Sequence, residues 1–250
     1  MRYLPFGYAG KLKAMLPRRP PAAFTLVELL AAIAIIGVMV GLIVPAVQQT
    51  RAAARQAACQ SNLRKWVLAC HCFAETHRGY LPRRGQGPAQ NPRLDRPEDW
   101  FNALPPLIEI EPYSSLHAAA RHPQASDNCP WICPEAQPLA TAKANDVYFT
   151  YAMNMGLSVW SAPRPDHIDR VGSLQTMVFM ADSLGPYCSV FPSRNDYRPI
   201  DRHAGSVNIA FLDGHVASVA SEDAGSQGRT LDHPDIRWFP PNGNWPGPPE

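Results

Sequence analysis

The chain has 250 residues and a formal net charge of +2, which leaves room for a sizeable core beside any membrane segment. Its charge is uneven, because residues 1–23 carry five bases and no acid, while the other 18 basic residues are set against 21 acidic ones. A basic leader on a mildly acidic body is untypical of a nucleic-acid-binding protein and indicates a targeting segment that stays in the cytosol. The five bases are Arg2, Lys11, Lys13, Arg18 and Arg19.

The remaining composition concerns the soluble part. There are 27 prolines and 16 glycines, so we expect many loops and short strands. The cysteine count is even, which suits an oxidising compartment but does not give the connectivity. The six cysteines are Cys59, Cys70, Cys72, Cys129, Cys133 and Cys188.

An apolar segment runs from Phe24 to Val44, with Glu28 as its only ionisable residue. As a helix, its 21 residues span about 31 Å, close to the thickness of the hydrocarbon core. The apolar part of a cleavable signal is shorter, roughly 7–15 residues. We therefore predict a transmembrane helix over residues 24–44, with Pro45 ending or kinking it. A carboxylate at the bilayer centre costs on the order of 2.5–3.5 kcal/mol, so Glu28 needs an explanation.

The charges on the two sides of this segment bear on its orientation. The basic residues after it nearly match the five before it, so the positive-inside rule favours a cytoplasmic N-terminus only weakly. These following residues are Arg51, Arg55, Arg64 and Lys65.

Residues 45–79 continue the helical pattern beyond the membrane. Apolar residues recur there at steps of four and three, which predicts an amphipathic stalk helix, and Gly79 is well placed as its C-cap. We expect one helix from about residue 24 to 78, bent near Pro45, whose second half packs one face on a domain. That face comprises Cys59, Leu63, Trp66, Cys70 and Phe73.

Residues 80–250 are predicted to form a globular domain. A polar loop at 81–99 is followed by a short apolar helix or turn region at 100–121, and the tail from 233 is expected to be irregular. Three later segments are strand-like, being short, rich in β-branched or aromatic residues and bounded by turns. They read DVYFTYAMN, TMVFMADS and SVNIAFLDGHVASVA. The fold class we predict is α+β, a long N-terminal helix packed on an antiparallel sheet.

The N-terminal segment resembles the processing site of type IV prepilins and pseudopilins. The resemblance lies in the basic leader followed by FTLVELL at residues 24–30. It implies that a prepilin peptidase cuts between Ala23 and Phe24 and methylates the new amine of Phe24. Ala23 stands where the family usually has glycine, Glu28 becomes the fifth mature residue, and Pro45 matches the family's proline.

The resemblance also implies a role for Glu28 in assembly. One helical turn from the N-terminus, its carboxylate lies near the membrane interface, where it can reach water. The helix dipole favours an anion there by about 0.3–1 kcal/mol. In a filament it would pair with the Phe24 amine of a neighbouring subunit, offsetting its desolvation. The alternative is an interfacial glutamate in an ordinary signal anchor.

A second resemblance concerns the C-terminal part. His203, followed after nine residues by Asp213-Gly214, resembles the H-x9-DG element of large bacterial pseudopilin-like proteins. We interpret Asp213-Gly214 as a two-residue type I′ hairpin turn between strands 207–212 and 215–219. The sharper alternative makes His203, Asp213 and His215 a metal site.

The cysteines leave several interpretations open. Cys129 and Cys133 are predicted to close a small loop disulfide; free thiols or half of a zinc site are the alternatives. Cys59 and Cys70 share a helical face about 16 Å apart along the axis, so they do not bond to each other. Buried thiols or bridges to the sheet remain for them.

The function predicted is that of a structural pseudopilin-like subunit, not an enzyme, because no known catalytic motif is present. Its partners would be prepilin peptidase, an inner-membrane assembly platform, other pseudopilins and membrane lipid, with no nucleic acid, cofactor or metal. It would be a single-pass protein of the bacterial inner membrane with a cytoplasmic N-terminus and a periplasmic domain, or a subunit of a surface filament.

Two other classes compete with this prediction. One is a membrane-tethered binding module that does not assemble and uses aromatic loops. The other is a tethered periplasmic hydrolase that uses His203 and Asp213. The tryptophans in question are Trp100, Trp131, Trp160, Trp238 and Trp245.

Overall fold

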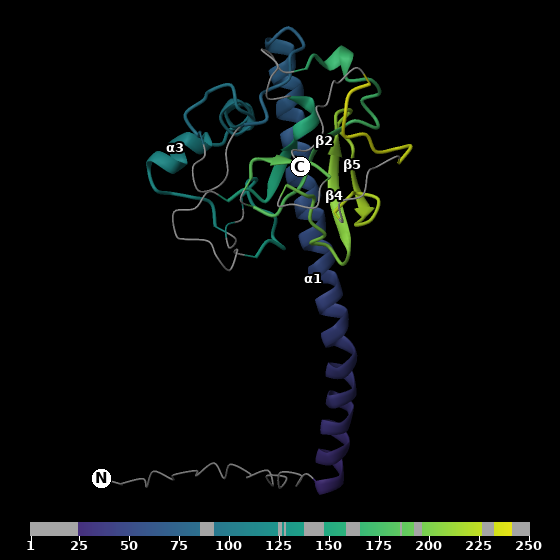
Figure 1. The fold of residues 1–250 in the computed structure, drawn as a ribbon. Coiled ribbons are helices and arrows are strands. Elements are labelled where there is room, and N and C mark those ends of the chain that lie inside the picture. Colours follow the sequence, from purple (N-terminus) through teal and green to yellow (C-terminus); the bar gives the residue numbers. More distant parts are fainter. Residues whose placement is uncertain are drawn as a thin grey trace, which may run out of the picture. The chain divides into compact units, whose positions relative to one another are not determined.

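The structure is a computed structural model of the whole chain (Figure 1). The chain divides into two compact units, Met1–Gln48 and Gln49–Glu250, each of which is described by itself. The leader, which ends at Ala23, and Phe24 after it lie outside the described residues. The described residues are 25–85, 93–124, 127, 129–137, 148–158, 166–185, 187–192, 197–226 and 233–241.

One long helix, α1 (Leu26–Thr76), dominates the N-terminal third of the chain and confirms the predicted continuous helix. Pro45 lies inside it. The helix ends as expected, because Gly79 adopts a φ of +82° and its N–H donates to the carbonyl of Ala74 at 2.8 Å. A residue with a positive φ at the end of a helix allows the N–H groups there to bond the last carbonyls of the helix. Glycine adopts this conformation without a steric penalty.

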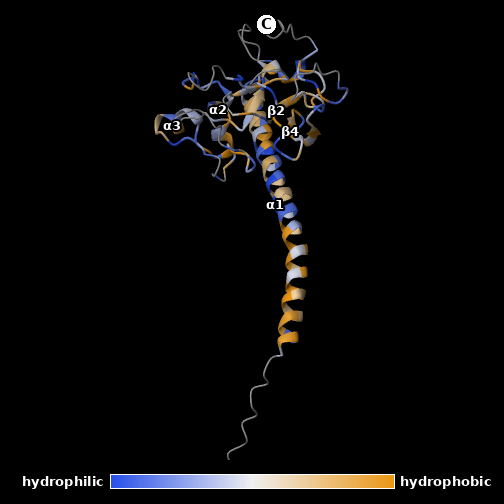
Figure 2. Cartoon of the chain, turned by 60° about the horizontal axis from the view of Figure 1, so that its bottom comes forward, coloured by the Kyte–Doolittle hydropathy of each residue, from blue (hydrophilic) through white to orange (hydrophobic). Residues whose placement is uncertain are grey.

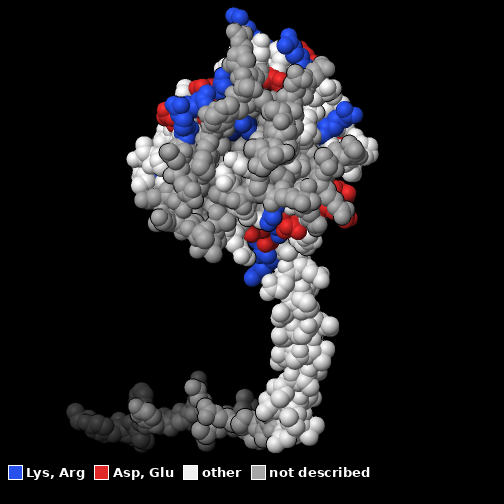
Figure 3. Space-filling view, viewed as in Figure 1, with Lys and Arg blue, Asp and Glu red and all other residues white. Residues whose placement is uncertain are grey.

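The part of α1 that belongs to the first unit is apolar and exposed all round. Figure 2 shows this stretch coloured as hydrophobic, and it is white on the face that Figure 3 shows. Among the described residues, α1 is the one helix long and apolar enough to cross a membrane. Its exposed side chains are Leu26, Val27, Leu29, Leu30, Ile33, Ile35, Ile36, Val38, Met39, Val40, Leu42, Ile43, Val44 and Val47.

The part of α1 in the second unit is amphipathic, and its predicted stripe is buried. All five stripe residues, from Cys59 to Phe73, are less than a tenth exposed. Trp66 is at the centre of the stripe; its ring lies 4.8 Å from that of Trp131 and 5.4 Å from that of Trp100. Its indole N–H donates to the carbonyl of Pro130 at 3.0 Å. The pattern of steps of four and three thus marked the face that packs on the domain.

Short helices follow where the sequence predicted a short apolar helix or turn region. They carry Trp100, Phe101 and Tyr113 into the core. Two more single turns flank the strands. In chain order the five are α2 (Trp100–Ala103), η1 (Pro105–Ile108), α3 (Tyr113–Ala118), η2 (Met155–Leu157) and η3 (Ile168–Arg170).

The strands form one five-stranded sheet of order β3-β1-β2-β4-β5 (Figure 1). The α+β class is confirmed, but the sheet is mixed where a wholly antiparallel one was expected, because β3 pairs with β1 in parallel. The other three pairings are antiparallel. The strands are β1 (Tyr151–Asn154), β2 (Val178–Asp182), β3 (Ser189–Val190), β4 (Ser206–Phe211) and β5 (Val216–Ala220).

Both faces of the sheet are covered. Side chains alternate along β1, so Met153 joins the cluster that includes the buried stripe of α1, while Ala152 joins a second cluster with Ile236 and Trp238 of the C-terminal segment. Polar contacts add to the helix packing, since Gln60 donates to Asn208 on β4 at 3.3 Å. The central strands are therefore core on both sides.

The hairpin between β4 and β5 differs from the predicted turn. Phe211 N–H donates to the carbonyl of His215 at 3.0 Å, so three residues lie between these two. Gly214 has a φ of +100°, whereas Asp213 is not among the residues of positive φ. A type I′ turn needs two such residues, and a three-residue loop needs one, so the predicted two-residue type I′ turn was wrong. Asp213 and Gly214 do lie in the turn.

Candidate functional site

The N-terminus of α1 is closed by a reciprocal pair of hydrogen bonds between Thr25 and Glu28. The Glu28 carboxylate accepts from the Thr25 N–H at 2.9 Å and from its hydroxyl at 2.8 Å. The Glu28 N–H donates to the Thr25 hydroxyl oxygen at 3.2 Å. This is a capping box, which satisfies N–H groups that have no partner within the helix. Its Thr-x-x-Glu spacing is present in the sequence, although the role predicted there for Glu28 was assembly, with an interfacial glutamate of an ordinary signal anchor as the alternative.

Glu28 therefore has a partner inside its own chain. The pairing with a neighbour's Phe24 amine stays a prediction, because Phe24 lies outside the described residues. A carboxylate has two oxygens and about four acceptor positions. Both of these bonds from Thr25 use one oxygen, Oε2, so the capping box leaves acceptor capacity on the carboxylate.

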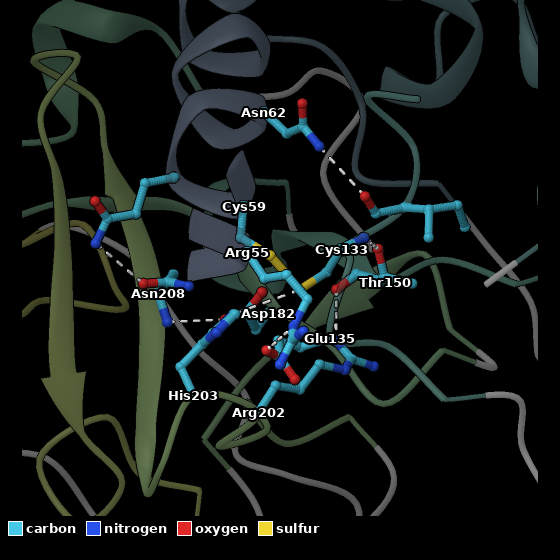
Figure 4. The surroundings of a disulfide bond; sticks show 12 residues. Arg55, Cys59, Asn62, Cys133, Glu135, Thr150, Asp182, Arg202, His203 and Asn208 are labelled. Atoms are coloured by element: carbon cyan, nitrogen blue, oxygen red, sulfur yellow. Dashed lines mark hydrogen bonds and ion pairs between the residues drawn. A yellow bond between two sulfur atoms is a disulfide. The ribbon is translucent and has the colours of Figure 1, made fainter. Parts of the chain in front are cut away.

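The second unit contains a buried cluster built around a disulfide (Figure 4). The bond joins Cys59 on α1 to Cys133, 74 residues later, with the Cα atoms 5.1 Å apart. The predicted Cys129–Cys133 pairing is wrong, and Cys129 is free. Cys129 instead begins a turn, in which its carbonyl accepts from Ile132 N–H at 3.1 Å. Since Cys59 belongs to the buried stripe, its sulfur meets Cys133 in the core.

His203 packs against this disulfide. Its side chain is 2% exposed, and its Nε2 lies 3.4 Å from the Cys133 sulfur and 3.7 Å from an Asp182 carboxylate oxygen. Burial lowers the pKa of the imidazole, while the Glu135 carboxylate opposes that shift. The structure thus assigns His203 to a site that sequence reasoning missed, because its neighbours come from distant parts of the chain.

Asp182, at the end of β2, is completely buried. One oxygen accepts the backbone N–H of Asn208 at 2.9 Å, and the other has no hydrogen-bond partner among the described residues. Burial raises the pKa of this carboxyl to about 7, although the nearby Arg202 guanidinium lowers it. A buried carboxylate oxygen without a partner is costly, so this atom calls for an explanation.

Charged and polar side chains enclose the cluster. Arg202 donates to the backbone carbonyls of Thr150, at 3.0 Å, and Ser183. Arg55 on α1 forms an ion pair with Glu135. The Thr150 hydroxyl accepts the backbone N–H of Cys133 at 2.7 Å. Two guanidinium groups and two carboxylates therefore surround the disulfide, and their formal charges cancel.

This geometry does not support the hydrolase alternative. His203 precedes β4 and Asp213 follows it, so a six-residue strand of about 20 Å separates them. Asp213 instead contacts His215 at 2.6 Å on the surface. In the buried cluster the Cys133 sulfur is bonded to Cys59, and the same His203 nitrogen faces both Cys133 and Asp182. In a catalytic triad the histidine contacts the nucleophile with one ring nitrogen and the orienting carboxylate with the other. The contacts of His203 do not have this arrangement.

The aromatic loops proposed for a tethered binding module lie mostly in the core. Trp100, Trp131 and Trp238 are each at most 5% exposed. Trp160 and Trp245 lie outside the described residues. The described tryptophans therefore serve packing.

Comparison with known proteins assigns the N-terminal region to a class. A family model described as "Prokaryotic N-terminal methylation motif" matches residues 18–44, so with its apolar helix the protein is of the membrane-anchored, single-pass kind. A second model, "Protein of unknown function (DUF1559)", matches residues 48–157. The two matches together are consistent with a type IV prepilin-like protein. No curated protein and no solved structure matches the chain.

The two matches leave part of the chain uncovered. Neither includes His203, Asp213 or Gly214, so the resemblance to proteins with an H-x9-DG element stays a prediction. Of the disulfide cluster, they cover Cys59 and Cys133 with Arg55, Glu135 and Thr150, and they leave out Asp182, Arg202 and His203.

Proposed function

We propose that this protein is a structural pseudopilin-like subunit that assembles through its N-terminal helix into a pilus or pseudopilus of a type II secretion or type IV pilus-like system. The observation that carries the proposal is the methylation motif at residues 18–44, together with the part of α1 within Met1–Gln48, whose apolar side chains are exposed on every face. A soluble protein does not leave so large an apolar surface uncovered, so lipid and neighbouring helices are its expected surroundings.

The proposed path to the filament begins with insertion. Residues 1–23 are a leader that stays in the cytoplasm, 24–44 cross the inner membrane, 45–79 form the stalk helix, and 80–250 form the periplasmic domain. Prepilin peptidase cuts between Ala23 and Phe24 and methylates the new amine. An inner-membrane platform then adds the subunit to its neighbours.

Glu28 guides the register of assembly in this proposal. After cleavage, Phe24 carries a cationic amine next to the capping box of Thr25 and Glu28. The oxygen of Glu28 that the capping box leaves free accepts a hydrogen bond from the Phe24 amine of an adjacent subunit. In an apolar surrounding such a charge-assisted bond is stronger than in water, so it favours one register over others.

Mass spectrometry of the membrane fraction tests processing. We expect the mature chain to begin at Phe24 and to carry one added methyl group on its α-amine. A mature protein that retains Met1 would rule the proposal out.

Photo-crosslinking tests assembly. A photoreactive residue at Ile35, which is 57% exposed, should link neighbouring subunits in the native host. Glu28→Leu should leave membrane insertion intact and reduce this crosslinking at least about tenfold, whereas Glu75→Gln, a change at an exposed carboxylate of the same helix, should not. Unchanged crosslinking in Glu28→Leu would favour the membrane-tethered module that does not assemble.

A further inference from the structure

The cluster around His203 has features that a disulfide alone does not need. The two sulfurs and the imidazole nitrogen all lie within 4.8 Å of one another, and all three residues are buried. His203 Nε2 faces a sulfur at 3.4 Å on one side and a carboxylate oxygen at 3.7 Å on another. A nitrogen and an oxygen 3.7 Å apart do not share a proton in a normal hydrogen bond.

These spacings are also compatible with a metal ion. Zinc binds thiolate at about 2.3 Å and imidazole at about 2.1 Å, so tetrahedral geometry places a sulfur and a nitrogen ligand about 3.6 Å apart. An imidazole and a carboxylate ligand would be about 3.4 Å apart by the same reasoning. The two distances from His203 Nε2 are both within about 0.3 Å of these values.

Asp182 supplies a second, independent observation. Its carboxylate is fully buried, and one of its oxygens has no hydrogen-bond partner among the described residues. Its other oxygen lies 3.7 Å from His203 Nε2 and already accepts a hydrogen bond from the Asn208 N–H. A cation beside the imidazole would offset the negative charge of this buried carboxylate.

Charge balance also permits the exchange of a disulfide for a metal. The surrounding formal charges cancel, two guanidinium groups against the carboxylates of Glu135 and Asp182. A disulfide is neutral, and so is a divalent cation with two thiolates. The main obstacle to a buried metal site is the cost of burying net charge. Replacing the disulfide by the metal and two thiolates buries no additional net charge.

From this geometry we infer that Cys59, Cys133 and His203 form a zinc site when the Cys59–Cys133 disulfide is reduced. The Asp182 carboxylate lies outside this group of three, 3.7 Å from the imidazole, and moves in as the fourth ligand. A thiol or phosphine reductant supplies two electrons, the sulfur–sulfur bond breaks, and two protons convert the sulfurs to thiols. Zn²⁺ then binds as both thiols release their protons. Freed from their bond, the sulfurs move apart to about 3.8 Å. The domain is thus closed by a covalent bond under oxidising conditions and by a metal under reducing ones.

Cobalt substitution tests this inference on the full chain in detergent micelles. The protein is reduced with a phosphine, freed of metal with a chelator and titrated with Co²⁺. We expect one equivalent to give the visible absorption of tetrahedral cobalt and a sulfur-to-cobalt charge-transfer band, both displaced by one equivalent of Zn²⁺. The oxidised protein should give neither band.

Matched variants identify the ligands. His203→Ala is purified with its disulfide intact, so that it starts folded, and is then reduced. Loss of an outer hydrogen-bond partner of a metal ligand lowers metal affinity by about 10–100-fold. Loss of the ligand itself in His203→Ala should therefore lower the zinc affinity by at least that factor. Asp182→Asn should weaken zinc binding, and Cys129→Ser, four residues from Cys133, should not. Cys129 is free and half-buried, so this change leaves the proposed site intact.

Two results would overturn the inference. One is a reduced wild-type protein that gives no cobalt bands and no zinc-dependent rise in its melting temperature. The other is cobalt binding that survives in His203→Ala but is lost in Cys129→Ser, because the ligands would then lie elsewhere. If the reduced, metal-free protein unfolds, zinc should restore its circular dichroism in the wild type and not in His203→Ala; equal behaviour of the two also counts against the site.

Discussion

The two parts of α1 are a single helix in two different surroundings. The part within Met1–Gln48 is the more apolar one, yet its side chains are exposed, and Leu26 remains 74% accessible. The part after Gln49 is rich in alanine and polar residues, yet its stripe from Cys59 to Phe73 is buried. Hydrophobicity alone therefore did not decide what entered the core. Periodicity did, because a stripe packs on one domain while an evenly apolar surface packs on lipid or on other helices.

The largest expected contrast in unfolding free energy comes from truncating one large apolar side chain to alanine in each part. Trp66→Ala should lower the free energy of unfolding of the domain by about 3–5 kcal/mol, because it empties a fully buried site and removes the bond to Pro130. Leu30→Ala, at a side chain that is 53% exposed, should change it by less than about 0.5 kcal/mol. Denaturant titration of the full chain in micelles measures both. Equal effects would mean that the two parts of the helix share one cooperative unit.

Removing the disulfide tests how the second part is tied to the domain. The double variant Cys59→Ser, Cys133→Ser should lose about 2–4 kcal/mol of unfolding free energy, since the bond joins residues 74 apart in sequence. The measurement is made with chelator present. Cys129→Ser is the control and should leave the stability unchanged. Similar destabilisation by the control and by the double variant would favour a Cys129–Cys133 pairing instead, because both variants would lack that bond.

The stability of the domain should also depend on pH through Asp99, which is buried and has no hydrogen-bond partner for either carboxylate oxygen among the described residues. Burial raises the pKa of this carboxyl from 3.8 to about 7. Between these values the folded chain keeps a proton that the unfolded chain has lost. The contribution of Asp99 to the unfolding free energy is therefore fully present at and below about pH 4, and it is lost as the pH rises to about 7.

The slope of that fall approaches about 1.4 kcal/mol per pH unit. Asp99→Asn should remove this contribution and reduce the measured slope, while Asp182, whose carboxyl pKa burial also raises to about 7, keeps its own. Asp95→Asn, at an exposed side chain nearby, should leave the slope unchanged. Urea titrations at a series of pH values measure the slope. A slope that Asp99→Asn does not change would assign the pH dependence to another group.

The smallest expected effect concerns the first part of α1. Thr25→Ala removes the capping box and should destabilise the first turn of the helix by about 1 kcal/mol. Hydrogen exchange of the amides near Glu28 should quicken by roughly fivefold, while exchange near Trp66 stays the same. Faster exchange at both places would show that the end of the helix and the domain are coupled.

The elements built from local patterns were predictable from the sequence. The stripe predicted α1 and its buried face, and the β-branched segments predicted β1, β2, β4 and β5. The short strand β3 was not foreseen, because two residues carry no periodic signal. The hairpin was assigned the wrong loop length, since Asp-Gly occurs both in type I′ turns and in longer loops with one left-handed residue.

The disulfide cluster was beyond sequence reasoning for a physical reason. Cys59, Cys133, Asp182 and His203 come from four separate segments, and only the packing of α1 on the sheet brings them together. Spacing along the chain favoured Cys129 as the nearer partner of Cys133. The capping box was different, because Thr25 and Glu28 are only three residues apart, directly before and within the first turn of one helix, and their spacing was already present in the sequence.

The covalent bond at Cys59 also determines how the protein bears tension. Cys59 lies 17 residues before Thr76, the last residue of α1. A pull along the helix from its N-terminal end therefore reaches a sulfur–sulfur bond before it reaches Trp66 or Phe73. The load passes from the helix into the segment around Cys133 and from there into the sheet, and the packed aromatic side chains beyond it are shielded. A subunit drawn by its stalk would yield elsewhere before its helix slid out of the domain.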